Sequence, residues 1–133
     1  MKSIYLDYNA STPIAKSVLD AMMPYLTSVF GNPSSSHAFG VEARAGVEKA
    51  REQVAKLLNC SAEEIVFTSG ATESNNMVIK GIAKSAGKGA HFITSQIEHP
   101  AVLEPCKHLE RYKYTVTYLP VDKHGMVDPA DLE

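Results

Sequence analysis

Apolar residues recur at helical spacing in four segments of the chain. In the first segment they share one helix face: Val18, Met22, Tyr25 and Val29. Pro24 is expected to kink or interrupt this helix, because proline lacks the amide that a helix interior needs. Three further helices are predicted over residues 38–58, 71–84 and about 100–112. Pro100 suits the first turn of the last of these, where a missing N–H costs nothing.

Strand-like patterns lie between and before these helices. They cover residues 3–6, 64–68, 91–94 and 114–120, and Asp128-Pro129 begins a final helix. Because strands alternate with helices, the pattern predicts an α/β layered fold with a largely parallel sheet. In such sheets ligands bind beyond the carboxyl ends of the strands, so the loops after Phe67 and Thr94 are the first places to look for a site.

The composition narrows the class of protein. The 133 residues carry a net charge of −2, with 44% apolar and 21% charged residues, which is typical of about one folded globular domain. The charges are scattered, so no basic patch indicates nucleic acid or an anionic membrane. No apolar run is long enough to span a bilayer, and the first residues, MKSIYLDYN, lack the apolar stretch of a signal peptide, so we expect a cytosolic protein. Cys60 and Cys106 have no metal-ligand spacing, and no metal site is predicted.

Small and hydroxyl residues fill the segment TSGATES at residues 68–74, where a predicted strand meets a predicted helix. The first amides of a helix have no partner within it and bind anions well. Gly70 leaves room for a phosphate, and Ser69 and Thr72 could add hydroxyl donors. Alternatively, Ser69 is an ordinary N-cap that satisfies these amides, with Thr72 or Glu73 nearby. The pattern alone favours the cap, and the lack of a Walker or Gly-x-Gly-x-x-Gly sequence disfavours nucleotide binding.

His99 follows the predicted strand at residues 91–94 and precedes Pro100. An imidazole at this edge of a sheet could stack on an aromatic ligand, or transfer protons because it ionises near neutral pH. A histidine at a helix start is more commonly a capping or surface residue. The remaining histidines, at positions 37, 91, 108 and 124, show no metal-ligand spacing, and of these only His37 lies in a Ser-rich loop.

Six segments together carry a resemblance that none carries alone. In chain order they are YLDYNASTP, FGNPSSSHAFG, ARAGVEKAREQVAKLLN, EIVFTSGATESNN, EHPAVLEPCKHLE and VTYLPVDKHGMVD. Their order and spacing resemble those of the cysteine desulfurases that serve iron–sulfur cluster assembly, which are fold-type I pyridoxal-phosphate enzymes of the class V aminotransferase group. The resemblance covers essentially the whole chain. Ser11 stands where the family more often has threonine, a change that should not alter the chemistry.

The resemblance implies roles for particular residues. The amides of Ala71 and Thr72, with the Thr72 hydroxyl, would hold the phosphate of pyridoxal 5'-phosphate. His99 would stack on the pyridine ring and transfer protons. Four residues of the first two segments would lie close to the site or to a dimer interface: Asn9, Ala10, Asn32 and His37.

The resemblance also implies a reaction and its partners. Desulfurases convert L-cysteine to L-alanine and pass the sulfur to an enzyme cysteine as a persulfide. They act as homodimers and supply an iron–sulfur scaffold or another sulfur-acceptor protein. The Schiff-base lysine of the family lies in a Ser-x-His-Lys segment, which this sequence does not contain. Cys106 falls in a helix that is structural in the family, so the nucleophilic cysteine is missing too, and we expect the 133-residue chain to be inactive by itself.

By the same resemblance, residues 1–60 form an N-terminal segment of strand, loops and helices. Residues 61–133 form the first part of the cofactor-binding large domain. Two other functions stay open from the sequence. The chain could belong to another class V enzyme, such as a selenocysteine lyase or an aminotransferase, or it could be a non-catalytic partner of a full-length desulfurase.

Overall fold

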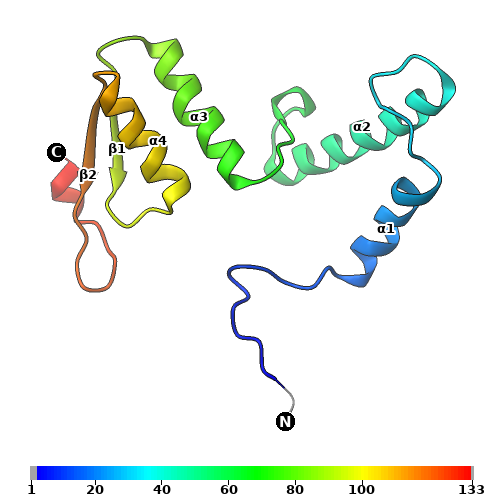
Figure 1. Ribbon diagram of the computed structural model, residues 1–133, viewed down its shortest axis with the longest axis horizontal. Helices are drawn as coiled ribbons and strands as arrows, with labels where there is room; N and C mark the ends of the chain where they lie inside the picture. The colour runs from blue at the N-terminus through cyan, green and yellow to red at the C-terminus, as the bar shows by residue number, and fades with distance from the viewer. Residues whose placement is uncertain (1–2, 133) are drawn as a thin grey trace. The chain divides into compact units, whose positions relative to one another are not determined.

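The computed structural model describes residues 3–132, and the chain divides between Val66 and Phe67 into two compact units. The first unit contains helices α1 and α2, and the second contains α3, β1, α4 and β2 in that order (Figure 1). The strands β1 and β2 are parallel, so the predicted α/β class is confirmed. Among residues 3–132, no helix combines the length and the apolar character that crossing a membrane requires.

The first unit is built on two helices, α1 (Lys16–Thr27) and α2 (Ala38–Leu58). Helix α1 runs through Pro24, so the expected interruption does not occur. An interior proline removes one helix hydrogen bond, and the remaining bonds can hold the helix together. The carbonyl of Pro24 then accepts bonds from the amides of Ser28 (2.9 Å) and Val29 (2.8 Å), which close the last turn. Asn59 is the C-cap of α2, and its left-handed φ of 55° suits a helix terminus.

Two predicted strands, residues 3–6 and 64–68, are absent from the structure, so these predictions were wrong. A short 3-10 helix, η1 (Ala62–Glu64), covers the start of the second segment. Ile65 does have extended dihedral angles (φ −87°, ψ 125°), but within residues 3–132 the strands β1 and β2 pair with each other alone. An apolar extended pattern specifies backbone angles, whereas a strand also needs a hydrogen-bonded neighbour.

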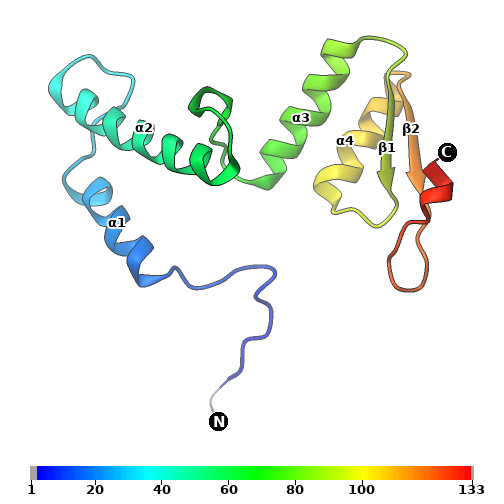
Figure 2. The same cartoon turned by 180° about the vertical axis from the view of Figure 1, so that it is seen from behind.

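The elements of the second unit lie close to their predicted positions. They are α3 (Ala71–Ala86), β1 (His91–Ser95), α4 (Pro100–Arg111) and β2 (Thr115–Leu119). A 3-10 helix, η2 (Pro129–Leu132), replaces the final predicted helix. Helix α4 connects the two parallel strands and lies along one face of them, and α3 packs beside α4 (Figures 1 and 2). The loops that follow β1 and β2 therefore leave from the same edge of the sheet, where the Gln96 amide donates to the Leu119 carbonyl at 3.0 Å.

A small core holds the second unit together. Its buried residues come from both helices and from β2: Ala83, Ala101, Cys106, Leu109 and Leu119. The hydroxyl of Tyr114, the residue before β2, donates to the Ala83 carbonyl in α3 at 3.0 Å. Packing around α4 thus fixes where this helix begins relative to α3, and both helix starts carry predicted site residues.

Replacing Leu109 with alanine is expected to lower the free energy of unfolding by about 2–4 kcal/mol, because the side chain is 4% exposed and its removal leaves a cavity. The same substitution at Leu57, which is 83% exposed, should change it by less than about 0.5 kcal/mol. Urea denaturation followed by circular dichroism gives both values. Equal losses for the two variants would contradict the assignment of Leu109 to the core.

Candidate functional site

The first turn of α3 has no side-chain cap. Gly70 is the N-cap residue, and glycine has no side chain with which to accept a bond from the helix amides. Ser69, the predicted N-cap, lies one residue earlier, and its amide and hydroxyl both donate to the Glu73 carboxylate, at 2.7 and 2.6 Å. The capping interpretation of this segment is therefore wrong, and the Ser69 hydroxyl is already used. Within the described chain, the amides of Ala71 and Thr72 have no side-chain acceptor.

Gly70 keeps the space around the start of α3 open. A β-carbon at this position would meet no atom within 4 Å. The backbone angles are extended (φ 161°, ψ 178°), so any residue could adopt them and glycine is not required for the conformation. A residue without a side chain instead lets an anion approach the helix amides closely.

Hydrogen bonds brace this loop on two sides. The Thr68 hydroxyl lies 2.7 Å from the Ser74 hydroxyl and donates to the Gly70 carbonyl at 3.2 Å. On the other side, the Glu73 carboxylate holds Ser69. The Ser69 hydroxyl, and after it the Ser69 amide, lower the pKa of Glu73 below its ordinary value. The loop therefore presents the amides of α3 in a fixed arrangement.

The bonds of Glu73 predict a pH dependence of stability. Because its pKa is lowered in the folded chain, its stabilising contribution is complete above the ordinary carboxyl pKa and is lost as the pH falls through the folded-state value. We expect wild type to exceed Glu73→Gln in unfolding free energy at pH 7, and the difference to shrink at pH 3. Denaturant titrations at both values measure it, and a difference that does not change with pH would refute this role.

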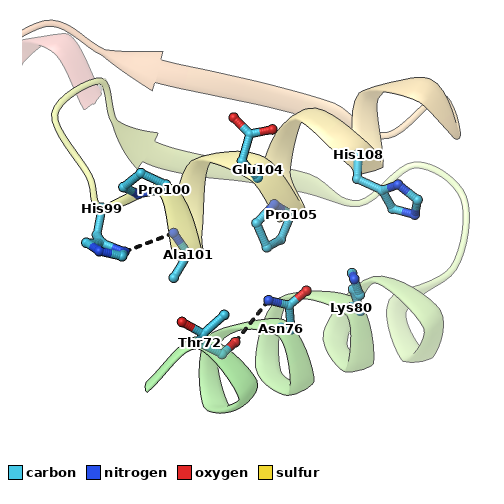
Figure 3. Close-up of a pocket in the computed structure, with 9 residues that line it drawn as sticks. All are labelled: Thr72, Asn76, Lys80, His99, Pro100, Ala101, Glu104, Pro105 and His108. Atoms are coloured by element: carbon cyan, nitrogen blue, oxygen red, sulfur yellow. Dashed lines mark hydrogen bonds between the residues drawn. The ribbon is translucent and has the colours of Figure 1, made fainter. Parts of the chain in front are cut away.

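His99 is the N-cap residue of α4. Its Nδ1 atom accepts a hydrogen bond from the Ala101 amide at 3.0 Å (Figure 3). Pro100, at the first helical position, has no N–H, so the imidazole satisfies the first amide that needs a partner. An accepting Nδ1 carries no proton, and the neutral ring therefore holds its proton on Nε2. The capping role and the chemical role predicted for His99 are thus compatible, since each uses a different nitrogen.

Thr72 and His99 line one pocket between α3 and α4 (Figure 3). Its volume of about 440 Å³ lies within the range of small-molecule sites. The wall from α3 consists of residues four apart on one helix face: Thr72, Asn76 and Lys80. The wall from α4 consists of Pro100, Ala101, Glu104, Pro105 and His108. Both helices begin at the end of the pocket where Thr72 and His99 lie (Figure 3), so the positive ends of two helix dipoles face that end.

The pocket gathers part of the predicted site. Thr72 and His99 lie in it, and Ala71 directly precedes Thr72 in the first turn of α3. The hydroxyl of Thr72 has no hydrogen-bond partner within residues 3–132, while its carbonyl accepts from the Asn76 amide group at 2.9 Å. Three further residues of this pocket, Asn76, Lys80 and His108, were not predicted from the sequence. The spacing of four residues from Thr72 would have placed Asn76 and Lys80 on the same face.

The other predicted residues belong to the first unit and take local structural bonds there. The Ala10 amide, next to Asn9, donates to the Asp7 carbonyl at 3.1 Å. The Asn32 side-chain oxygen accepts from the Ser34 amide at 2.9 Å, and the His37 Nδ1 atom caps α2 by accepting from the Gly40 amide at 3.4 Å. The proximity of these residues to the pocket stays a prediction.

Cys106 is buried in α4, with 3% of its surface exposed. Burial raises the pKa of its thiol, and the charges of Glu110 and Glu98 raise it further. A thiol with a raised pKa holds its proton near neutral pH and is a poor nucleophile. Within residues 3–132, no cluster of three or more histidine, cysteine or acidic side chains is placed to hold a metal ion.

Comparisons with known proteins show the family of the chain. The family model of class-V aminotransferases matches residues 4–133. A cysteine desulfurase IscS from Dictyoglomus turgidum is 56% identical over an alignment of 133 positions, which covers 99% of this chain and 34% of that protein. This chain therefore spans about a third of the length of that curated relative.

Solved structures show the same similarity. A NifS-like protein superimposes with a TM-score of 0.92 at 45% identity, covering 97% of this chain and 36% of that one. A structure described as SspA in complex with cysteine superimposes with a TM-score of 0.90 at 44% identity, covering 98% of this chain and 38% of that one. The predicted fold-type I architecture is thereby confirmed for the part that this chain represents. With its family model matched from residue 4 to residue 133, the chain belongs to the class-V aminotransferases.

Proposed function

We propose that this chain supplies the phosphate-binding helix and the ring-covering histidine of a pyridoxal 5'-phosphate-dependent cysteine desulfurase. One observation carries the proposal: the uncapped start of α3 shares a pocket with His99. The similarity to desulfurases over 99% of the chain supports it as well. Because this chain spans about a third of the length of that relative, the activity is proposed for the whole enzyme and not for the 133 residues alone.

The residues at the pocket end fit the coenzyme's phosphate. Two amides, from Ala71 and Thr72, and the Thr72 hydroxyl are donors without a side-chain partner in the described chain, and a doubly charged phosphate needs several such donors. Gly70 leaves the space that the phosphate would occupy. When bound, pyridoxal phosphate supplies an electron sink for substrate carbanions. His99 would cover the ring and exchange a proton through Nε2, because Nδ1 is committed to the cap of α4.

The proposed reaction takes L-cysteine to L-alanine. The carbon–sulfur bond would break with its electron pair left on the β-carbon, which takes up a proton, and the sulfur atom would join an enzyme thiol that loses its proton, to form a persulfide. The SspA structure with cysteine belongs to a similar protein and supports cysteine as the substrate. We further propose a homodimer that passes sulfur to an iron–sulfur scaffold or another acceptor protein, in the cytoplasm.

Replacing Thr72 with valine tests the phosphate site. Valine keeps the shape but removes the hydroxyl, so we expect about 10- to 100-fold weaker binding of pyridoxal phosphate, since a hydrogen bond to a charged group contributes about 1.5–3 kcal/mol. Equilibrium dialysis measures the dissociation constant without reference to activity. The control variant Thr115→Val makes the same change at an exposed residue of β2 that does not line the pocket, and it should leave binding unchanged. Unchanged binding in Thr72→Val would contradict the assignment.

The reaction itself is tested on the whole enzyme. We expect alanine and persulfide from L-cysteine, and the isolated 133-residue chain should release no appreciable alanine. A clear preference for selenocysteine, or transfer of an amino group to a keto acid, would instead identify a selenocysteine lyase or an aminotransferase. Both rivals would use the same phosphate site, so this assay and the dialysis answer separate questions.

A further inference from the structure

A second groove continues from the pocket along α3 and α4. It shares Lys80 and His108 with that pocket, and its volume is about 390 Å³. The basic groove, as we call it, is defined by its polar and aromatic lining: Lys80, Lys84, Lys88, His108, Tyr112 and Tyr114. None of the residues that line it is acidic.

The lysines of the basic groove lack acidic partners. Lys80, Lys84 and Lys88 are exposed, and none of them forms an ion pair or a side-chain hydrogen bond within residues 3–132. The one acidic residue at the adjoining pocket, Glu104, is held by Lys107 at 2.7 Å. Because the whole chain has a net charge of −2, this positive surface is a local feature and does not follow from the overall composition.

The spacing of these charges suits an extended chain. Lys80 and Lys84 are four residues apart on α3, which is a rise of about 6 Å along the helix. Lys88 follows the end of α3 at Gly87, whose φ of 74° turns the chain. In an extended peptide, alternate side chains on one side repeat about every 6.6 Å. Acidic side chains at alternate positions would therefore meet successive lysines.

Aromatic rings form part of the opposite wall. The rings of His108 and Tyr112 lie in contact, with their centroids 4.8 Å apart, and Tyr112 is 61% exposed. They offer an apolar surface for the stems of acidic side chains. Single-stranded RNA would require a series of open stacking platforms, one for each base. A single ring pair engaged with itself suits a peptide better.

We propose that the basic groove binds an extended acidic peptide segment of a partner protein. The groove joins the pocket of Thr72 and His99 at Lys80 and His108, so the bound segment lies next to that pocket. The interaction depends on charge and on α3 geometry and needs no cofactor. It is therefore independent of the proposed enzyme reaction.

Fluorescence anisotropy with a labelled eight-residue peptide, carrying glutamate at alternate positions, tests the proposal on the purified protein. The same peptide with glutamine in place of glutamate should bind about tenfold more weakly, because its ion pairs are gone. Raising the salt concentration from about 0.05 to 0.5 M should strongly weaken the binding of the glutamate peptide, since salt screens the attraction between exposed charges. Tighter binding of a single-stranded RNA than of the glutamate peptide would overturn the peptide assignment, as would the absence of peptide binding.

Variants locate the binding. The triple variant K80Q/K84Q/K88Q should bind the glutamate peptide about tenfold more weakly. The variant K80R/K84R/K88R should retain binding, because it keeps the three positive charges. The matched control K49Q/K56Q/K123Q removes the same charge from exposed lysines outside the basic groove and should leave the affinity unchanged. Circular dichroism confirms that each variant is folded. If the control variant weakened peptide binding equally, the attraction would be non-specific and the basic groove would not be the binding site.

Discussion

Replacing Gly70 with alanine is expected to weaken the binding of pyridoxal phosphate about a hundredfold while making the chain slightly more stable. The added methyl group would meet no protein atom within 4 Å, and the extended backbone accepts alanine. Alanine has less backbone freedom than glycine in the unfolded chain, so the free energy of unfolding should rise by about 0.4–1 kcal/mol. The same methyl group occupies space at the start of α3, where a phosphate has to approach the amides closely. Equilibrium dialysis and urea denaturation measure the two effects separately.

Gly81 provides the matched control for this prediction. It lies in the interior of α3, and a β-carbon there would also meet no atom within 4 Å. Gly81→Ala should stabilise the helix by about 0.5–1 kcal/mol and leave coenzyme binding unchanged. If Gly70→Ala behaved like Gly81→Ala in both measurements, the open space before α3 would have no role in binding.

The fold shows what periodicity can and cannot predict. Helices α2, α3 and α4 and strands β1 and β2 lie within a few residues of their predicted bounds, because each of them carries its own pattern of apolar residues. Residues 3–6 and 64–68 carry strand-like patterns too, yet neither has a hydrogen-bonded neighbour in the described chain. Pairing depends on distant segments, which a local pattern does not contain.

The candidate site was also predicted only in part, because part of it depends on contacts that a local pattern does not contain. Hydroxyl residues around Gly70 fit both a cap and a phosphate cradle, and the pattern alone favoured the cap. The deciding fact is the direction of the Glu73 side chain, which bonds Ser69 and leaves the amides of Ala71 and Thr72 without a cap. A rotamer choice of this kind depends on three-dimensional packing, so residue types and spacing do not determine it.

The basic groove lay beyond sequence reasoning because its parts are spread over two helices. The positions of Lys80 and Lys84 on one face follow from their spacing of four residues. That His108 and Tyr112 lie across from them depends on how α4 packs on α3, which is a tertiary fact. Charges that are scattered along the sequence therefore come together in the folded chain as a local concentration of positive charge.

Removing the imidazole of His99 is expected to lower turnover of cysteine by the whole enzyme about 10²- to 10⁴-fold, which is the usual contribution of a positioned proton-transfer group. His99→Asn and His99→Ala should show this loss equally. They should differ in stability, because asparagine is a good N-cap and can accept from the Ala101 amide, whereas alanine cannot. The unfolding free energy should fall by about 1 kcal/mol in His99→Ala and stay near the wild-type value in His99→Asn.

This pair of variants separates the two nitrogens of His99. The cap uses Nδ1, which accepts from Ala101 at 3.0 Å, while the proposed proton transfer uses Nε2. If restoring the cap in His99→Asn also restored turnover, the histidine would act by placing α4 and not by moving a proton. If turnover stayed low while stability returned, structural damage could not explain the loss. A shift in the pH dependence of the residual activity would then assign the missing proton transfer to the imidazole, since asparagine does not titrate.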